Sequence, residues 1–394
     1  MCRPGWPTKH SARDDHYELP TEGVTISPYF SADYREVMGR AEGLPDHDTI
    51  GSHARTASRH LARPVDSSSR DHTQSKTEMT MEQSLAITAV AAVLWTATAQ
   101  AQEIPVTLTT KTGTLQGTLL IPAGAKTPMP VALLIAGSGP TDRDGNSPLL
   151  PGKNNSLKML AEGLGQHGIA TLRYDKRGVA ASMGAMGKES DLRFTTYADD
   201  AVDWLEWLRA DQRFSRRIVI GHSEGALIGV LAAQRSPVSH VVSLAGAGRP
   251  IGDVLDEQLS RMMPPDVMSD ARRIMTELKA GRAVDSVPKP LLMVFRPSVQ
   301  PYMISWLPID PAQEVGRLTV PTLIVQGTTD TQVTKGDAER LAAGHPRATL
   351  ELIDGMNHVL KEIREASQQT ASYSDPALPL HPRLVESITK FVGQ

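Results

Sequence analysis

From residue 102 onward, apolar residues follow two patterns that alternate along the chain. Short apolar runs such as 131–136 indicate strands that are buried on both faces. Longer stretches with apolar residues three or four positions apart indicate amphipathic helices. The predicted strands are 106–110, 114–121, 131–136, 169–174, 217–221, 240–244, 322–326 and 349–353, and the predicted helices are 157–167, 197–209, 225–234, 337–343 and 384–392.

This alternation predicts an α/β protein with a mostly parallel central sheet and helices on both faces. The first two strands are separated only by Lys111-Thr112-Gly113, which indicates a hairpin with a glycine turn. The pattern breaks between residues 249 and 317. That stretch contains many prolines and six of the fifteen methionines, and it is too long for a loop. It is therefore predicted to be an inserted helical cap over the carboxyl edge of the sheet.

The first 101 residues do not share these patterns. Residues 1–78 hold six of the twelve histidines and no sustained apolar period, so they cannot bury enough apolar surface to fold. We interpret them as disordered, or as the result of an upstream start codon. Residues 85–95 form an apolar run too short to span a bilayer, followed by small residues with two A-x-A sites. Residues 79–101 are therefore predicted to be a signal peptide, which makes the protein periplasmic or secreted, and cytoplasmic if the signal is not used.

The signal peptide has one weak feature and one alternative. Its first residues, 79–84, include no basic residue, whereas signal peptides usually begin with a positive charge. The alternative is an apolar helix that packs on the folded domain. The domain itself is predicted to run from 102 to 394.

The sequence Gly221-His222-Ser223-Glu224-Gly225 is the strongest chemical motif in the chain. A buried-strand pattern precedes it and a helix pattern rich in small residues follows it. A sharp strand-to-helix turn exposes the serine hydroxyl, and side chains at the two flanking positions would collide, so Gly221 and Gly225 are required there. Ser223 is therefore the candidate nucleophile. The competing interpretation is an ordinary Gly-Ser turn.

A serine hydroxyl needs a base, which in turn needs an acid to orient it. Asp330 ends a turn directly after the strand 322–326, and His358 ends a loop after the strand 349–353. Each could be a solvated loop residue, but both follow strand ends in the order that this type of site uses. His345 and His381 do not follow strand ends and are weaker candidates, and His240 is expected to pack within or beside its strand.

The loop after the strand 131–136 is predicted to help to stabilise an oxyanion. Such a site needs two backbone donors, and one is expected to be the N–H of Glu224, directly after the nucleophile. The second is expected to be the N–H of Ser138, with Gly139 as the alternative. The charged residues Asp142, Arg143 and Asp144 could anchor this loop by ion pairing or line the pocket, and anchoring is favoured.

Composition narrows the possible partners. The formal net charge of −3 provides no electrostatic attraction to nucleic acid or to an anionic membrane. The single cysteine, Cys2, excludes a disulfide framework and any cysteine-based metal site.

Five segments of the sequence resemble the serine aminopeptidase-like (S33-type) branch of the α/β-hydrolase superfamily, which is rich in bacterial esterases. The resemblance covers about residues 104–394 and rests on residues 137–146, Tyr174-Asp175-Lys176-Arg177-Gly178, Gly221-His222-Ser223-Glu224-Gly225, Gly327-Thr328-Thr329-Asp330 and Met356-Asn357-His358. It implies the α/β-hydrolase fold, the triad Ser223, Asp330 and His358, and no metal or organic cofactor. Many relatives carry His-Gly where this chain has Ala136-Gly137, which leaves the second oxyanion donor open.

Three functions are compatible with these residues. The leading one is hydrolysis of small-molecule carboxylic esters through an acyl-enzyme, and the second is a peptidase of the same fold. An aminopeptidase would need carboxylates near the pocket, for which Asp253, Asp256 and Glu257 are the candidates. A non-catalytic binding protein would normally lack one triad residue. Within the cap, most apolar residues are expected to form its own core, whereas Met303 and Trp306 are predicted to contact the acyl group.

Overall fold

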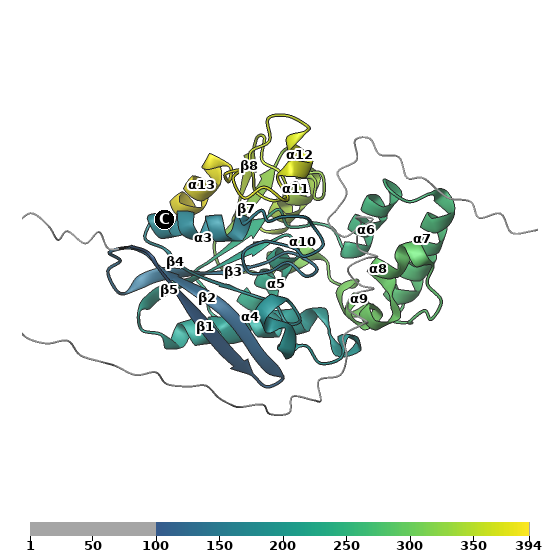
Figure 1. Ribbon diagram of the computed structural model, residues 1–394, viewed down its shortest axis with the longest axis horizontal. Helices are drawn as coiled ribbons and strands as arrows, with labels where there is room; N and C mark the ends of the chain where they lie inside the picture. The colour runs from purple at the N-terminus through teal and green to yellow at the C-terminus, as the bar shows by residue number, and fades with distance from the viewer. Residues whose placement is uncertain (1–99, 394) are drawn as a thin grey trace, which may run out of the picture.

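The apolar runs of the sequence form the central strands of one eight-stranded sheet. The computed structural model describes residues 100–393, and its sheet has the order β1-β2-β4-β3-β5-β6-β7-β8 (Figure 1). The strands are β1 (Gln102–Thr110), β2 (Gly113–Ile121), β3 (Met129–Ile135), β4 (Ala170–Tyr174), β5 (Phe214–His222), β6 (His240–Leu244), β7 (Thr322–Gly327) and β8 (Ala348–Ile353).

Most of the sheet is parallel. Strand β2 pairs antiparallel with both β1 and β4, and every pairing from β4 to β8 is parallel. The antiparallel start comes from the predicted hairpin, since its short turn can only reverse the chain. With helices on both faces, this strand order is the α/β-hydrolase fold, and the predicted fold class is confirmed.

Two groups of helices cover the sheet. Helices α3 (Ser156–Gln166) and α13 (Pro382–Val392) pack on one face, where their apolar residues join a cluster with alternate residues of β3, β5, β6 and β7. Helices α4 (Phe194–Ala210), α5 (Glu224–Ala233) and α11 (Lys335–Gly344) contribute to the cluster on the other face. Each face of a central strand therefore meets helices, which explains why the strand sequences are apolar without alternation.

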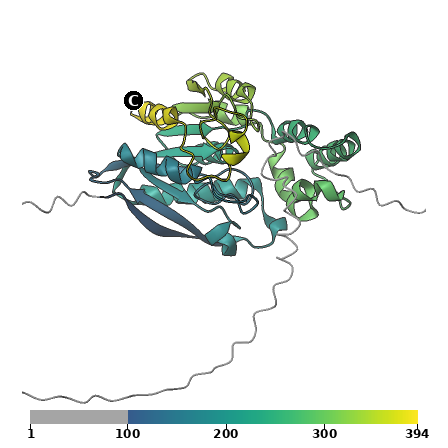
Figure 2. The ribbon, with the colours of Figure 1, turned by 45° about the horizontal axis from the view of Figure 1, so that its top comes forward.

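The segment between β6 and β7 is helical and lies beside the sheet. Helices α6 (Ile251–Ser260), α7 (Pro265–Lys279), α8 (Leu292–Phe295) and α9 (Gln300–Trp306) form a group at one side of the molecule (Figures 1 and 2). We call these four helices the cap. The next helix, α10 (Pro311–Gly316), packs instead against α11 and α5 of the main domain.

Predicted and observed elements agree closely in the main domain. Observed helices and strands start or end at most four residues from the predicted positions, as for β1, which begins at Gln102 rather than 106. The sequence did not predict the short turns of 3-10 helix at Ala180–Ala185 and Glu189–Asp191, nor the short helix α12 (Gln368–Ala371).

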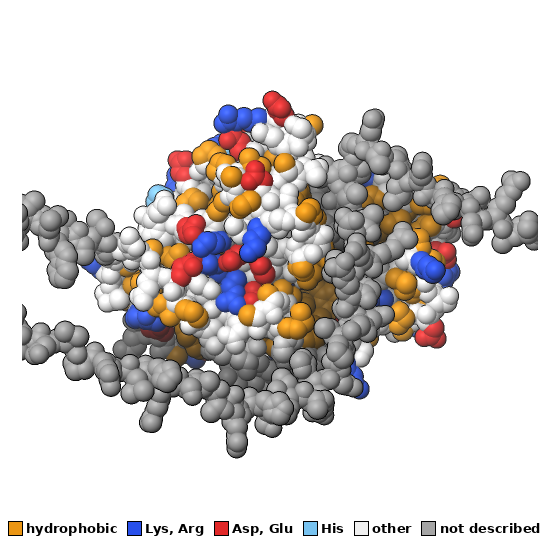
Figure 3. Space-filling model, viewed as in Figure 1, with side chains coloured by type: hydrophobic (Ala, Val, Ile, Leu, Met, Phe, Trp, Pro, Cys, Tyr) orange, Lys and Arg blue, Asp and Glu red, His pale blue; other side chains and the backbone are white. Residues whose placement is uncertain are grey.

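The surface of the described residues carries mixed charge. Lys and Arg side chains lie among Asp and Glu side chains near the middle of the face seen in Figure 3. This is the distribution expected for a chain whose formal net charge is only −3. Among the described residues, no helix combines the length and apolarity needed to cross a bilayer.

Candidate active site

Ser223 occupies a sharp turn between β5 and α5. Its backbone has φ 55° and ψ −120°, a conformation that costs energy for a residue with a side chain. The two neighbouring glycines make the turn possible. A Cβ added at Gly221 would lie 2.1 Å from the carbonyl oxygen of Gly225, and one added at Gly225 would lie 2.3 Å from that of Ile135. The turn leaves Ser223 half-buried at the carboxyl end of β5.

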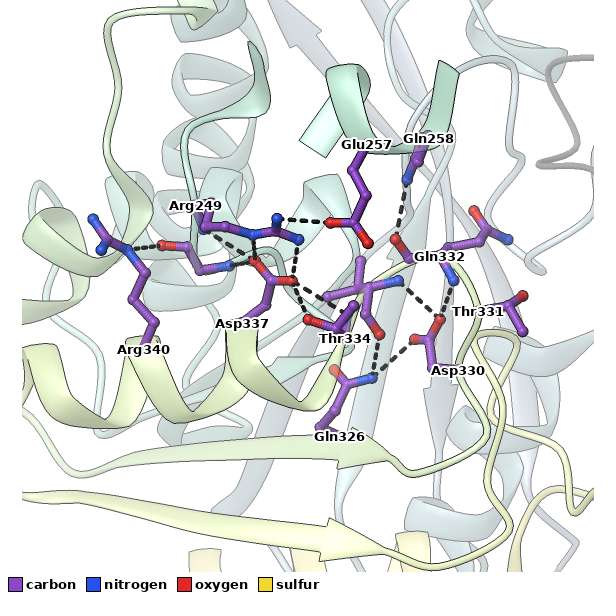
Figure 4. A network of polar contacts seen from close by, with 12 residues as sticks. Arg249, Glu257, Gln258, Gln326, Asp330, Thr331, Gln332, Thr334, Asp337 and Arg340 are labelled. Atoms are coloured by element: carbon purple, nitrogen blue, oxygen red, sulfur yellow. Dashed lines mark hydrogen bonds and ion pairs between the residues drawn. The ribbon is translucent and has the colours of Figure 1, made fainter. Parts of the chain in front are cut away.

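Asp330 and His358 meet across the ends of two neighbouring strands. His358 Nδ1 lies 2.8 Å from Asp330 Oδ2, and Gln326 Nε2 donates to the same oxygen at 3.0 Å. The other carboxylate oxygen, Oδ1, accepts the backbone N–H groups of Gln332 and Val333 (Figure 4). The Asp330 side chain is fully buried, so these four donors replace the water it has lost.

These contacts fix the charge of Asp330 and the tautomer of His358. Burial alone would raise the pKa of the Asp330 carboxyl, but His358 and the two backbone N–H groups outweigh it and lower that pKa. The ionised carboxylate can only accept, so the proton of neutral His358 is on Nδ1. His358 Nε2 then remains unprotonated and can accept a proton.

Ser223 and His358 line one small cavity. Its volume is about 40 Å³, and Gly137, Ser138 and Tyr373 are among the other lining residues. The Ser223 hydroxyl has no hydrogen-bond partner within residues 100–393. Hydrogen bonds between a serine and its base are often long without substrate, so this geometry is compatible with proton transfer.

The two backbone N–H groups predicted to stabilise an oxyanion belong to residues beside Ser223 and beside this cavity. Glu224 is the first residue of α5, so its N–H has no acceptor four residues earlier within the helix. Ser138 lines the cavity directly after Gly137. A Cβ at Gly137 would lie 3.2 Å from the Cβ of Ser223, which shows how closely the loop approaches the turn.

Ion pairs anchor the loop that carries Ser138. Arg143 pairs with Asp175 at 2.6 Å, and Arg173 pairs with Asp144 at 2.7 Å. The Asp142 carboxylate accepts the backbone N–H groups of Asp144 and Asn146. The ion pairing favoured from the sequence is therefore observed for Arg143 and Asp144, whereas Asp142 holds the loop through backbone hydrogen bonds.

His222 also belongs to the site, although no role was predicted for it from the sequence. Its Nε2 donates to the backbone carbonyl of His358 at 2.7 Å, and the two imidazole centroids are 4.9 Å apart. Burial, followed by the proximity of His358, lowers the pKa of His222 to about 3. His222 is therefore neutral at physiological pH, and it holds the loop of the candidate base against the turn of Ser223.

The three other histidines weighed from the sequence, His240, His345 and His381, do not line this cavity. His345 Nε2 contacts the carbonyl of Val320, and His381 Nδ1 accepts the N–H of Arg383 at the start of α13. His240 packs edge-on against Phe391. None of the three is placed to receive a proton from Ser223.

The structure does not bring the predicted cap residues to the cavity. Trp306 stacks on Phe194 of α4 at a centroid distance of 4.8 Å, and Met303 is buried in the same apolar cluster. Neither lines the cavity, because each packs between the cap and the main domain.

The cap carboxylates are also directed elsewhere. Asp256 pairs with Arg272 and Asp253 with Lys279. Glu257 pairs with Arg249, which also holds the buried Asp337 (Figure 4). None of the three lines the cavity, so they are not placed to bind a substrate amine there. Within residues 100–393, no group of three His, Cys, Asp or Glu side chains is arranged to hold a metal ion.

The chain is similar to known proteins in both sequence and structure. The family described as "Serine aminopeptidase, S33" matches residues 153–305, which include Ser223 but end before Asp330 and His358. The esterase EstD of Thermotoga maritima is 30% identical over 251 residues, which are 62% of this chain and 58% of EstD. The chain therefore spans less than two thirds of the length of this curated relative.

Solved structures with similar folds include esterases and a peptidase. Est1E from Butyrivibrio proteoclasticus is 16% identical, with a TM-score of 0.47 over 74% of this chain and 99% of its own. A puromycin-hydrolyzing peptidase of Mycobacterium tuberculosis is 16% identical, with a TM-score of 0.48 over 77% of this chain and 40% of its own.

The family follows from three observations: the strand order, the turn at Ser223 and the match over residues 153–305. The chain has the α/β-hydrolase fold and is similar to the serine aminopeptidase-like branch of the α/β-hydrolases, as its motifs predicted.

Proposed function

We propose that this protein is a serine hydrolase that cleaves carboxylic esters through an acyl-enzyme. The observation that carries the proposal is the hydrogen bond that His358 Nδ1 donates to Asp330, beside a cavity that both His358 and Ser223 line. The name of the EstD relative supports an esterase. No cap carboxylate reaches the cavity, which removes the feature that would have favoured an aminopeptidase.

The reaction follows from the placement of the polar groups. Ser223 Oγ attacks the carbonyl carbon of the ester while its proton moves to His358 Nε2. The negative oxygen that results accepts the N–H groups of Ser138 and Glu224. When the tetrahedral intermediate collapses, the alcohol leaves with the proton from His358, and the acyl group remains on Ser223. Water then attacks the acyl-enzyme by the same route and releases the acid.

The cavity favours short acyl groups. The space in it that water-sized groups can reach is small, about 40 Å³. The apolar side chains that line it, Leu150 and Val359, come from loops of the main domain rather than from the cap. Acetyl and butyryl esters are therefore expected to be better substrates than octanoyl esters.

Two measurements test the proposed function together. A fluorophosphonate probe labels only an activated serine, and a panel of nitrophenyl esters and aminoacyl nitroanilides separates esterase from peptidase activity. Wild-type protein should react with the probe and cleave the short esters, and Ser223→Ala should lose about 10⁴-fold or more in kcat. An active Ser223→Ala protein, or cleavage of nitroanilides but not esters, would contradict the proposal.

Export through a signal peptide is part of the same proposal. Residues 79–99 lie outside the described residues, so the support is the apolar run and the two A-x-A sites of the sequence. Strand β1 begins at Gln102, so cleavage before Gln100 or before Gln102 leaves the sheet complete. The amino terminus of the exported chain should be one of these two residues. Cytoplasmic protein that retains residues 79–101 would contradict export.

A further inference from the structure

A buried lysine lies directly beside the candidate oxyanion site. Lys176 comes two residues after β4, and its side chain is only 1% exposed. Its Nζ is 2.8 Å from Glu224 Oε1 and donates to the carbonyl oxygen of Gly137 at 2.6 Å. Glu224 is also buried, and its second carboxylate oxygen accepts the hydroxyl of Tyr302 from α9 at 2.9 Å.

Stability alone does not explain this ion pair. Removing two charges from water costs as much as their attraction returns, so a buried pair is weak evidence for stabilisation. The chain offers a direct comparison in Arg177 and Asp200, which are 2.6 Å apart and similarly buried. Arg177 donates to the carbonyls of Ala185 and Thr112, away from the cavity, whereas Lys176 donates into the loop that carries Ser138.

The contact with Gly137 determines where the N–H of Ser138 points. The two belong to the same peptide group, which is trans, because the only cis bond within residues 100–393 is Thr127-Pro128. In a trans peptide the C=O and the N–H point in opposite directions. A cation that holds the carbonyl on one side therefore directs the N–H of Ser138 to the other side, where Ser138 lines the cavity with Ser223.

We propose that Lys176 is a positioning residue of the oxyanion hole, which acts by holding the Gly137–Ser138 peptide group. Glu224 then has two functions. Its backbone N–H is one donor, and its carboxylate holds the lysine that orients the other donor. Both donors are thereby fixed relative to each other by one buried ion pair. This proposal rests on the proposed serine hydrolase function.

The test compares two neutralised ion pairs. The first variant combines Lys176→Met with Glu224→Gln, which removes the donor to Gly137 without leaving a single buried charge. The matched control combines Arg177→Met with Asp200→Asn. Loss of a whole oxyanion donor costs roughly 10²–10³-fold in kcat. A misdirected donor should cost less, about 10–100-fold, with KM changed by no more than about threefold.

An inhibitor provides a readout that a purely structural role would not change. Trifluoromethyl ketones form a tetrahedral oxyanion on an active serine, so their inhibition constant should rise by the same factor as kcat falls. The control variant should retain kcat and the inhibition constant within about threefold, even where it melts at a lower temperature. Equal losses in both variants, or unchanged kcat in the first, would overturn the role of Lys176.

A second variant keeps the test valid if the first does not fold. Lys176→Gln can still donate to Glu224 but is one bond shorter than lysine, so it should lose contact with Gly137 and show the same loss of kcat. Unchanged kcat in this variant also overturns the role. An inactive wild-type protein that fails to react with fluorophosphonate would instead overturn the proposed function, and with it this inference.

Discussion

The turn at Ser223 and the cap are held in place by different kinds of interaction. The turn is fixed by close backbone packing, because a side chain at Gly221 would overlap the backbone of Gly225, and one at Gly225 would overlap the backbone of Ile135 in the neighbouring strand β3. The cap is positioned by contacts between segments that are far apart in sequence, such as Trp306 on Phe194 and Arg296 on Glu189.

Because of this difference, we expect substitutions in the two regions to affect different properties, turnover in one and stability in the other. Residues at the carboxyl edge of the sheet meet at the cavity, and changes there should affect turnover more than folding. Residues of the cap that pack on α4 should affect folding more than turnover. Three changes test the contrast, beginning with the one expected to have the largest effect.

Asp330→Asn should reduce kcat by about 10⁴-fold, because an amide favours the wrong tautomer of His358. Steady-state kinetics on a short nitrophenyl ester measure the effect. Asp354→Asn is the matched control, since this exposed aspartate directly follows the neighbouring strand β8 and accepts the hydroxyl of Thr328 in that turn. Near-normal turnover of Asp330→Asn would show that another group orients His358.

Trp306→Ala should lower the free energy of unfolding by about 3–5 kcal/mol, since it removes a buried aromatic side chain. Urea unfolding measures this loss. The preference for acyl chain length should stay unchanged, whereas Leu150→Ala, which enlarges the cavity, should shift it towards longer chains. A changed acyl preference in Trp306→Ala would place the cap in the substrate site after all.

His222→Gln should make the protein less sensitive to acid. The pKa of His222 is about 3 in the folded state and about 6.5 when unfolded, so between these values only the unfolded chain takes up the proton. The free energy of unfolding of the wild type should therefore decrease as the pH is lowered through this range, by up to about 1.4 kcal/mol per pH unit.

The comparison of the two proteins isolates this contribution. Between pH 7 and pH 5, wild type should lose about 2 kcal/mol more than His222→Gln, measured by urea unfolding at both values. Other titrating groups, including Asp330, are shared by both proteins and cancel. Equal losses would indicate that His222 is accessible to protons in the folded state.

The sequence predicted the main domain well because its signals are local. Apolar runs predicted the sheet, whereas glycine positions and polar residues directly after strands predicted Ser223, Asp330 and His358 as site residues. The structure confirms the sheet and brings Asp330 and His358 into contact. Asp142, Arg143 and Asp144 were also interpreted correctly, because a cluster of charges in a glycine-rich loop has few roles other than anchoring it.

The remaining features depend on contacts that a linear pattern does not contain. Lys176 looked like one of three charged residues after a strand, and only the fold places it against Gly137 and Glu224. Met303 and Trp306 are apolar, as pocket residues often are, but the orientation of their side chains depends on which face of α9 packs against α4. Gln326 donates a hydrogen bond to Asp330, and its place as a polar residue at the end of an apolar strand sequence was the one signal from which this role could have been predicted.

The wide separation of the site residues along the chain has a consequence for synthesis. His222 and His358 are 136 residues apart, and the strand that leads to His358 is the last in the sheet. A ribosome that adds about 5–20 residues per second needs roughly 7–27 s to pass from one to the other. Throughout this interval the nascent chain carries its serine without a base. In the proposed mechanism, the protein is therefore synthesised as an inactive precursor, and Ser223 becomes reactive only when the final segments have been translated and have docked.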